Sequence, residues 1–131
     1  PEDVLVGKNI NDISKVKKLD DIENNDIILD IGPTTVQKIK EIIKISKTVL
    51  WNGPAGYFEN RRFLNGTLSI AEKISENTKK KSLISIVGGG DTISAINKSK
   101  KKYNFTHLST AGGAFLEFLE GKDLPGLNVL K

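Results

Sequence analysis

The stretch SIVGGGDT at residues 85–92 combines a strand, a glycine turn and the start of a helix. Residues 83–87 form a short apolar run rich in β-branched side chains, which is typical of a buried strand. The three glycines that follow leave no side chain at the end of that strand, so a ligand can approach the backbone closely. Asp and Thr then open a segment with helical spacing at 93–100. Because free N–H groups and the helix dipole attract anions, the stretch predicts a cradle for nucleotide phosphates.

The composition is typical of one globular domain. A chain of 131 residues is long enough for a core, and 37% apolar with 27% charged residues excludes a disordered or fibrous protein. The absence of cysteine excludes a disulfide framework and fits the cytoplasm, and the single histidine, His107, excludes a multi-histidine metal centre. No apolar run reaches membrane-spanning length. The lysine runs at 79–81 and 98–102 lie near expected helix ends without interleaved aromatics, so we expect neither membrane nor nucleic acid as partner.

Strand-like and helix-like segments alternate along the chain. Thr34 and Thr35 are expected to cap the first helix, and its apolar positions predict one buried face. These positions are Val36, Ile39, Ile42 and Ile43. The expected strands are 4–6, 26–31, 48–51, 83–87 and 105–109, and the expected helices are 36–44, 64–77, 93–100 and 114–120, with a loop carrying short strand pieces at 7–25.

This alternation predicts the α/β class, as a three-layer α/β/α arrangement with a parallel sheet and helices on both faces. Ligands bind such sheets outside the carboxyl ends of the strands. Three of the expected strands end in a glycine-containing turn, so we expect these turns to meet at one crevice.

The other two turns are WNGPAGYFE at 51–59 and STAGG at 109–113. In the first, Pro54 stiffens the loop, and the Glu59 carboxylate is suited to accept hydrogen bonds from ribose hydroxyls. The second offers another helix start rich in N–H groups. Alternatively, Glu59 is an ordinary charge at a helix start, and STAGG is a tight connection without a ligand.

The glycine turn at 88–90 alone leaves the class of protein open. Gly88 and Gly90 fit the start of G-x-G-x-x-G, but the last position is Ile93, which is too large for close helix–strand packing. A nicotinamide-dependent reductase can carry a similar run, although the chain has no redox cysteine pair. A nucleotide-sensing module is a further alternative. In a nucleotide site, Asp91 is a suitable partner for the accompanying metal ion.

A series of short motifs spans the whole chain. They are DIGP at 30–33, LWNGP at 50–54, FE at 58–59, GGGDT at 88–92, ST at 109–110, GGA at 112–114, LE at 116–117, LEGK at 119–122 and LPG at 124–126. In order and spacing they resemble the C-terminal, nucleotide-binding portion of phosphoglycerate kinase. Ala111 stands where many members of that family have a third glycine, and its methyl group should be tolerated if its φ is negative.

The resemblance implies that residues 1–131 are an incomplete, Rossmann-like C-terminal domain of a two-domain kinase. The phosphoglycerate-binding N-terminal domain would lie before Pro1, and a chain without methionine that starts in a strand-like run fits a piece of a longer protein. The family's nucleotide domain has six parallel strands, with the first two between the third and fourth. We therefore expect a gap in the sheet of this chain.

The resemblance further implies reversible phosphoryl transfer in glycolysis, between 1,3-bisphosphoglycerate and MgADP, giving 3-phosphoglycerate and MgATP. The full-length enzyme is expected to be a cytoplasmic monomer, and this chain to be inactive alone. The implied site has the following parts. Ile28 and Leu29 line the adenine pocket, Glu59 holds the ribose, Asn52 and Pro54 flank the phosphates, Gly89, Gly90 and Thr92 cradle them, Asp91 faces Mg²⁺, and Gly112 and Gly113 offer N–H groups near the transferred phosphoryl group.

Overall fold

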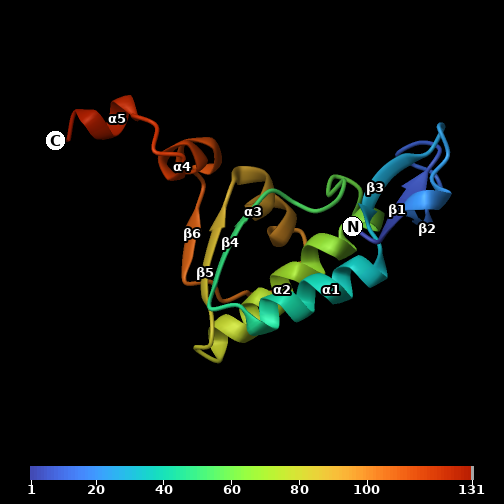
Figure 1. Cartoon of the computed structure of the whole chain (residues 1–131), viewed down its shortest axis with the longest axis horizontal. Coiled ribbons are helices and arrows are strands. Elements are labelled where there is room, and N and C mark those ends of the chain that lie inside the picture. The colour runs from blue at the N-terminus through green and yellow to red at the C-terminus, as the bar shows by residue number, and fades with distance from the viewer. Residues whose placement is uncertain (131) are drawn as a thin grey trace.

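A computed structural model describes residues 1–130 as an α/β protein with two separate three-stranded sheets (Figure 1). The antiparallel sheet has the order β2-β1-β3 and consists of β1 (Asp3–Gly7), β2 (Lys15–Lys18) and β3 (Ile27–Ile31). The parallel sheet has the order β4-β5-β6 and consists of β4 (Thr48–Asn52), β5 (Ile84–Gly88) and β6 (His107–Ser109).

The helices connect these strands. They are α1 (Pro33–Ile45), α2 (Asn65–Lys79), α3 (Gly90–Asn97), α4 (Gly112–Leu119) and α5 (Pro125–Asn128), with 3₁₀ turns η1 (Leu19–Asp21) and η2 (Arg61–Phe63). In Figure 1, α1 and α2 lie side by side, and the antiparallel sheet lies at the end of this pair where α1 begins. The parallel sheet lies toward the other end, and α4 and α5 project beyond it.

Two apolar clusters form the core. Ile43 of α1, Ile70 and Ile74 of α2 and Leu83 make the first, and Ala71 of α2, Val87 of β5 and Ile96 of α3 make the second. Partly buried Trp51 packs against both clusters. The parallel sheet is therefore anchored to α2 and α3, which fixes the carboxyl ends of its strands relative to one another.

The strand expected at 26–31 forms as β3, but the expectation that it lies in the parallel sheet is wrong. β3 pairs antiparallel with β1, which also pairs with β2, and β3 and β4 belong to different sheets. A meander through β2 and η1 brings β3 back alongside β1, and such short connections favour antiparallel pairing. The break falls between β3 and β4, where the resemblance implies a gap.

The start of α1 is capped differently from the sequence expectation. Thr34 and Thr35 lie inside the first turn, and their backbone N–H groups donate to the Asp3 carboxylate at 3.0 and 2.7 Å. Burial acts to raise the pKa of Asp3, but the hydrogen bonds from both threonines outweigh it and lower this pKa to about 2. The cap therefore comes from β1, which joins α1 to the antiparallel sheet.

Other boundaries differ by a few residues. Ile42 is 54% exposed rather than buried, because it lies about 100° around the helix from the buried Ile43. The third helix begins at Gly90, earlier than expected, and the sequence pattern does not predict the four-residue α5. Within residues 1–130, no helix is both long and apolar enough to cross a membrane.

Candidate functional site

The turn after β5 requires glycine at position 89. Gly89 has a φ of 93°, and a Cβ built there would lie 2.7 Å from the Asn52 Oδ1 atom. The next residue begins α3, which has no side-chain cap. The first N–H groups of α3 have no partner within the helix, so they are available to an anion at the positive end of the helix dipole.

The turn after β4 is tied to the start of α3. Thr92 is fully buried, and its Oγ1 accepts a hydrogen bond from the Gly53 N–H at 2.8 Å. Gly53 has a φ of 99°, a conformation that favours glycine. This bond spans the two neighbouring strands and sets the position of the loop after β4 against the glycine turn.

The turn after β6 meets the same point. The Gly89 N–H donates to the Ser109 carbonyl oxygen at 3.1 Å. A Cβ at Gly112 would lie 2.9 Å from the Gly89 Cα and 3.1 Å from the Asn52 Oδ1. Asn52 therefore lies where all three turns meet, as the order of strands and glycine turns in the sequence predicts.

Two glycines of this crevice are not required by packing within the chain. A Cβ at Gly90 or at Gly113 would meet no atom within 4 Å. Asp91, in the first turn of α3, has an exposed side chain. Ala111 has a φ of −83°, so the condition for tolerating its methyl group is met. The crevice therefore combines free backbone donors, open space and one carboxylate, which suits a phosphate group with a divalent cation.

The residues expected at the adenine lie on β3. Leu29 is buried, and its carbonyl oxygen accepts a hydrogen bond from the Tyr57 N–H at 2.7 Å. Its neighbour Ile28 is 56% exposed. β3 is thus joined directly to the loop that leads to Glu59, although β3 lies outside the parallel sheet.

The loop that carries Pro54 and Glu59 is fixed at two points. The Ala55 N–H donates to the Oγ1 of the fully buried Thr67 at 2.9 Å. Farther along, the Lys98 ammonium donates to the carbonyl oxygen of Glu59 at 3.2 Å. The Glu59 side chain itself is exposed, so its carboxylate can accept hydrogen bonds from a ligand.

Sequence reasoning gives no role to Thr67 and Lys98, which hold the loop after β4, or to Asp30, which joins β3 to the start of α2. Asp30 is 1% exposed, and it accepts hydrogen bonds from the N–H groups of Gly66 and Ile31, both at 2.9 Å. Burial raises the pKa of Asp30, and these two hydrogen bonds only partly oppose that rise. A charge in the apolar run at 27–31 is the signal that could have identified Asp30.

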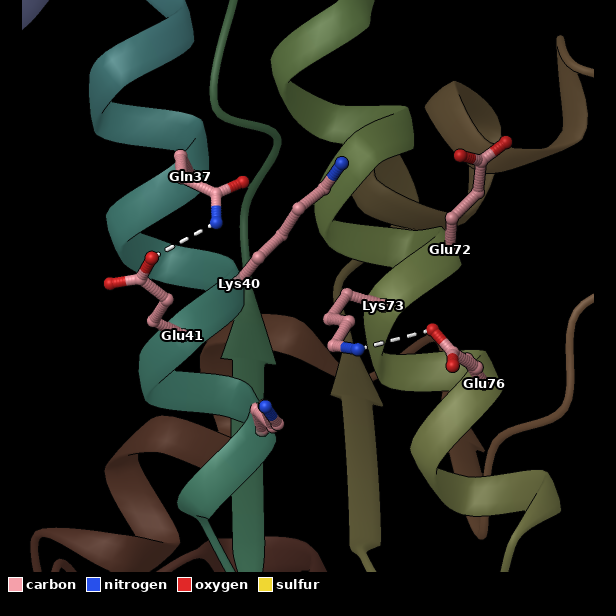
Figure 2. Close-up of a pocket in the computed structure, with 7 residues that line it drawn as sticks. Gln37, Lys40, Glu41, Glu72, Lys73 and Glu76 are labelled. Atoms are coloured by element: carbon pink, nitrogen blue, oxygen red, sulfur yellow. Dashed lines mark hydrogen bonds and ion pairs between the residues drawn. The ribbon is translucent and has the colours of Figure 1, made fainter.

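The groove between α1 and α2 lies away from the glycine turns. It has a volume of about 500 Å³ and is lined by charged side chains of both signs (Figure 2). Gln37 donates to Glu41 at 3.0 Å, and Lys73 pairs with Glu76 at 3.1 Å. These two contacts join four of the seven lining side chains, and nothing else in the groove points to a ligand, so we assign it none.

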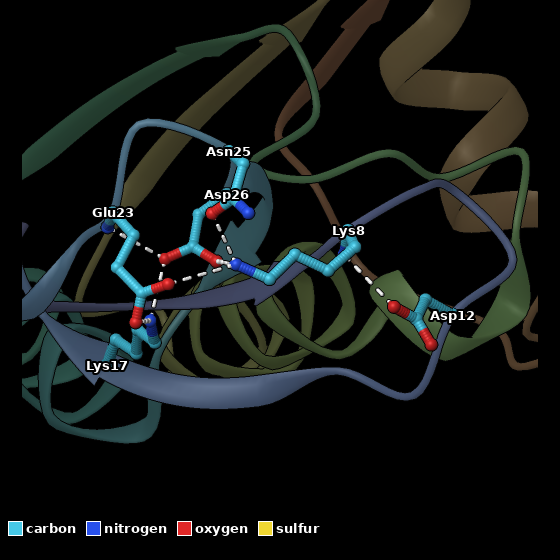
Figure 3. Close-up of polar contacts among 6 residues, drawn as sticks. All are labelled: Lys8, Asp12, Lys17, Glu23, Asn25 and Asp26. Carbon is cyan, nitrogen blue, oxygen red and sulfur yellow. Dashed lines mark hydrogen bonds and ion pairs between the residues drawn. The ribbon is translucent and has the colours of Figure 1, made fainter.

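A second charged cluster stabilises the antiparallel sheet. Figure 3 shows Lys8 and Lys17 converging on Asp26, with nitrogen–oxygen distances of 2.9 and 2.7 Å, and both lysines also pair with Glu23. Hydrogen bonds from Lys17, from the Glu23 N–H and from Lys8 lower the pKa of Asp26. Opposite charges are matched here, which indicates a structural role. Residues 1–130 contain no group of three or more His, Cys, Asp or Glu able to hold a metal ion.

Comparisons with known proteins all lead to one family. The family model named Phosphoglycerate kinase matches residues 1–122. A phosphoglycerate kinase of Dictyoglomus turgidum is 49% identical over the whole chain, which covers 33% of that protein. The solved phosphoglycerate kinase of Coxiella burnetii is 40% identical with a TM-score of 0.87, covering all of this chain and 33% of its own.

The solved enzyme of Pyrococcus horikoshii is similar as well, at 33% identity and a TM-score of 0.82 over 99% of this chain and 31% of its own. The chain therefore spans about a third of the length of the relatives it matches. The match extends from the antiparallel sheet through all three glycine turns. On these grounds, the chain belongs to the phosphoglycerate kinase family.

Proposed function

We propose that a full-length protein containing this chain is a phosphoglycerate kinase that binds MgADP and MgATP at the three glycine turns. The observation that carries this proposal is their convergence at Asn52, where a Cβ at Gly89 or Gly112 would come within 2.7 or 3.1 Å of its Oδ1. Family membership supports it, because the family is named for this reaction.

The nucleoside would bind between β3 and the loop after β4. The half-exposed Ile28 and its neighbour Leu29 would form one wall of the adenine pocket. Glu59 would accept hydrogen bonds from the ribose hydroxyls, since its carboxylate is exposed. The Tyr57–Leu29 hydrogen bond supports this arrangement, because it joins the two parts of the pocket.

The phosphates would bind at the start of α3. The N–H groups of Gly90 and Thr92 belong to its first turn, and Gly89 gives the turn before them its shape. Asn52 and Pro54 would flank the phosphates from the neighbouring turn. Mg²⁺ usually takes one or two carboxylates together with phosphate oxygens, so the single exposed Asp91 is a sufficient protein ligand. The bound Mg²⁺ would neutralise phosphate charge.

The reaction moves one phosphoryl group from the acyl phosphate of 1,3-bisphosphoglycerate to the terminal phosphate of ADP, leaving 3-phosphoglycerate and ATP. Its transition state spreads negative charge over the oxygens of the transferred group, so positioned donors supply most of the stabilisation. Gly113 would direct its backbone N–H group at this position from the start of α4, whereas the Gly112 N–H already donates to the Thr110 carbonyl oxygen at 3.1 Å and would have to share that bond. The open space at Gly113 leaves room for the phosphoryl group.

The phosphoglycerate would bind outside residues 1–131, on the part of the relatives that this chain does not cover. The proposed context is glycolysis in the cytoplasm, with a monomeric full-length enzyme. No membrane or nucleic acid is needed as a partner in this scheme.

Calorimetric titration of the full-length protein with MgADP and with NADPH tests the proposal. We expect saturable binding of MgADP and no binding of NADPH. Binding of NADPH without MgADP would replace the kinase with a nicotinamide-dependent reductase. Binding of MgADP without turnover of 1,3-bisphosphoglycerate would instead identify a nucleotide-sensing module.

A further inference from the structure

One side chain joins the end of α3 to the loop that carries Glu59. The Lys98 Nζ atom lies 3.0 Å from the carbonyl oxygen of Phe58 and 3.2 Å from that of Glu59. The same nitrogen lies 5.1 Å from the centroid of the Phe58 ring. A lysine ammonium has three donors, so two of them are used on adjacent carbonyl groups of one loop.

These contacts are stronger than ordinary surface contacts. Hydrogen bonds from a charged donor are about twice as strong as neutral ones, and the position over an aromatic ring adds a cation–π attraction. Lys98 is partly buried, and so is its hydrogen bond to the Phe58 carbonyl, whereas the bond to the Glu59 carbonyl is exposed. The loop 57–60 is therefore attached firmly to α3 at this point.

Other contacts of the loop lead in different directions. The Tyr57 N–H donates to Leu29 on β3, and the Asn60 Nδ2 donates to the carbonyl oxygen of Ile10. Both of these tie the loop to the antiparallel sheet. Lys98 supplies the connection to the helix that begins at the glycine turn.

α3 itself is anchored at its beginning. Its eight residues span about 12 Å, and buried Thr92 fixes its first turn to Gly53. Lys98 follows directly after its last residue. One short helix therefore contacts the phosphate turn at one end and the Glu59 loop at the other.

We propose that Lys98 is a positioning residue for nucleoside recognition, which holds the Glu59 loop at the distance from the phosphate turn that one nucleotide spans. The inference rests on the proposed function, in which Glu59 binds the ribose. Lys98 does not touch the ligand in this scheme. Its loss lets Glu59 move relative to the phosphates, so the ribose contact weakens while the phosphate contact stays.

The test compares a ligand that contains ribose with one that does not. Full-length wild-type protein and the Lys98→Met variant are titrated with MgADP and with magnesium tripolyphosphate. Because Lys98→Met removes two charge-assisted hydrogen bonds, we expect about tenfold weaker MgADP binding and unchanged tripolyphosphate binding. In kinetics, KM for MgADP should rise by a similar factor, with kcat at saturation nearly unchanged.

Four further variants sharpen this test. Lys98→Arg, which keeps charged donors, should recover most of the MgADP affinity. Lys102→Met, at an exposed lysine outside the loop contact, should bind both ligands like wild type. Lys98→Met should have no additional effect in a Glu59→Gln background, because both changes remove the same ribose contact. If Lys98→Met does not fold, Lys98→Gln replaces it in the test, and we again expect weaker MgADP binding with unchanged tripolyphosphate binding.

The contradicting results distinguish a failure of the proposed function from a failure of the inference about Lys98 alone. A wild-type protein that does not bind MgADP overturns the proposed function and this inference with it. Wild-type binding of MgADP combined with an unchanged affinity in Lys98→Met overturns the inference alone. Equal weakening of MgADP and tripolyphosphate also overturns it, since that pattern indicates a general loss of structure.

Discussion

Asn52 and the glycines around it divide into residues that shape the site and residues that leave space in it. Gly89 and Gly112 have neighbours so close that a methyl group would displace them, because a Cβ at either position would lie within 3.1 Å of the Asn52 Oδ1. Gly90 and Gly113 have none within 4 Å. The first pair explains how closely the three turns meet, and the second pair leaves the space that a bound phosphate would need.

Gly90→Ala should separate stability from binding. Position 90 is helical and open, so alanine is expected to raise the free energy of unfolding by about 0.4–1 kcal/mol. Its methyl group would occupy the proposed phosphate space and weaken MgADP binding by about tenfold or more. Denaturant unfolding and calorimetry measure the two effects. Gly112→Ala is the matched variant, and we expect it to lower both the free energy of unfolding and the affinity for MgADP. An unchanged MgADP affinity in Gly90→Ala would place the phosphates elsewhere.

Asp91→Asn should lower the rate far more than the stability. The side chain is exposed, so its replacement removes no buried contact, whereas loss of the proposed Mg²⁺ ligand should lower kcat by about a hundredfold or more. Steady-state kinetics and thermal unfolding of the full-length protein measure both. Near wild-type turnover would leave Asp91 as an ordinary charge at a helix start.

Helices and strands are largely predictable from local patterns, but their pairing is not. The expected helix 64–77 and strand 83–87 agree with α2 and β5 to within two residues, because periodicity and glycine placement are local signals. β3 pairs with β1, and the hydrophobic periodicity of a strand does not predict which other strand it pairs with. In the site, the glycine turns are predictable from their places at strand ends. Asp30 and Lys98 are not, since their partners are 36 and 40 residues away.

The cap on α1 predicts an acid-dependent stability. The pKa of Asp3 is lowered to about 2, so its carboxylate stabilises the folded state above its unfolded pKa of about 4, and this stabilisation is lost as pH falls through 2. Asp3→Asn should lower the free energy of unfolding by about 1 kcal/mol at pH 7, because it removes the charge and replaces one of the two oxygens that accept from the Thr34 and Thr35 N–H groups with an NH₂ donor. The difference from wild type should shrink below about pH 4.

Chemical denaturation of the full-length protein between pH 7 and pH 3 measures this difference. Asp20→Asn, at an exposed carboxylate of η1, is the control and should leave the unfolding curves unchanged. A difference that stays constant over this range would show that the Asp3 charge is not what caps α1.

In the proposed function, the described chain would hold a site for only one of the two reactants. Its two arginines, Arg61 and Arg62, lie together on η2, and each donates to a backbone carbonyl, of Lys98 and Asn11 respectively. Neither is directed at the glycine turns, where a phosphoglycerate would need cationic partners. The relatives are about three times as long, and in the proposed function the second reactant would bind on the part that this chain does not cover.

The 131-residue chain alone should therefore not transfer a phosphoryl group. Most of the rate in such a reaction comes from holding both reactants in line and stabilising the charge between them. A coupled assay of the purified chain should show no ATP formation from 1,3-bisphosphoglycerate and MgADP, whereas the full-length protein should form ATP readily. Robust turnover by the chain alone would mean that the acceptor site lies within residues 1–131.

The claim that three glycine turns hold the phosphates of a nucleotide is tested most directly by a crystal structure of the full-length protein with MgADP. We expect the diphosphate within hydrogen-bonding distance of the N–H groups at the start of α3, with Mg²⁺ beside Asp91 and the ribose at Glu59. A nucleotide bound instead in the groove between α1 and α2, or at the Lys8–Lys17 cluster, would contradict it.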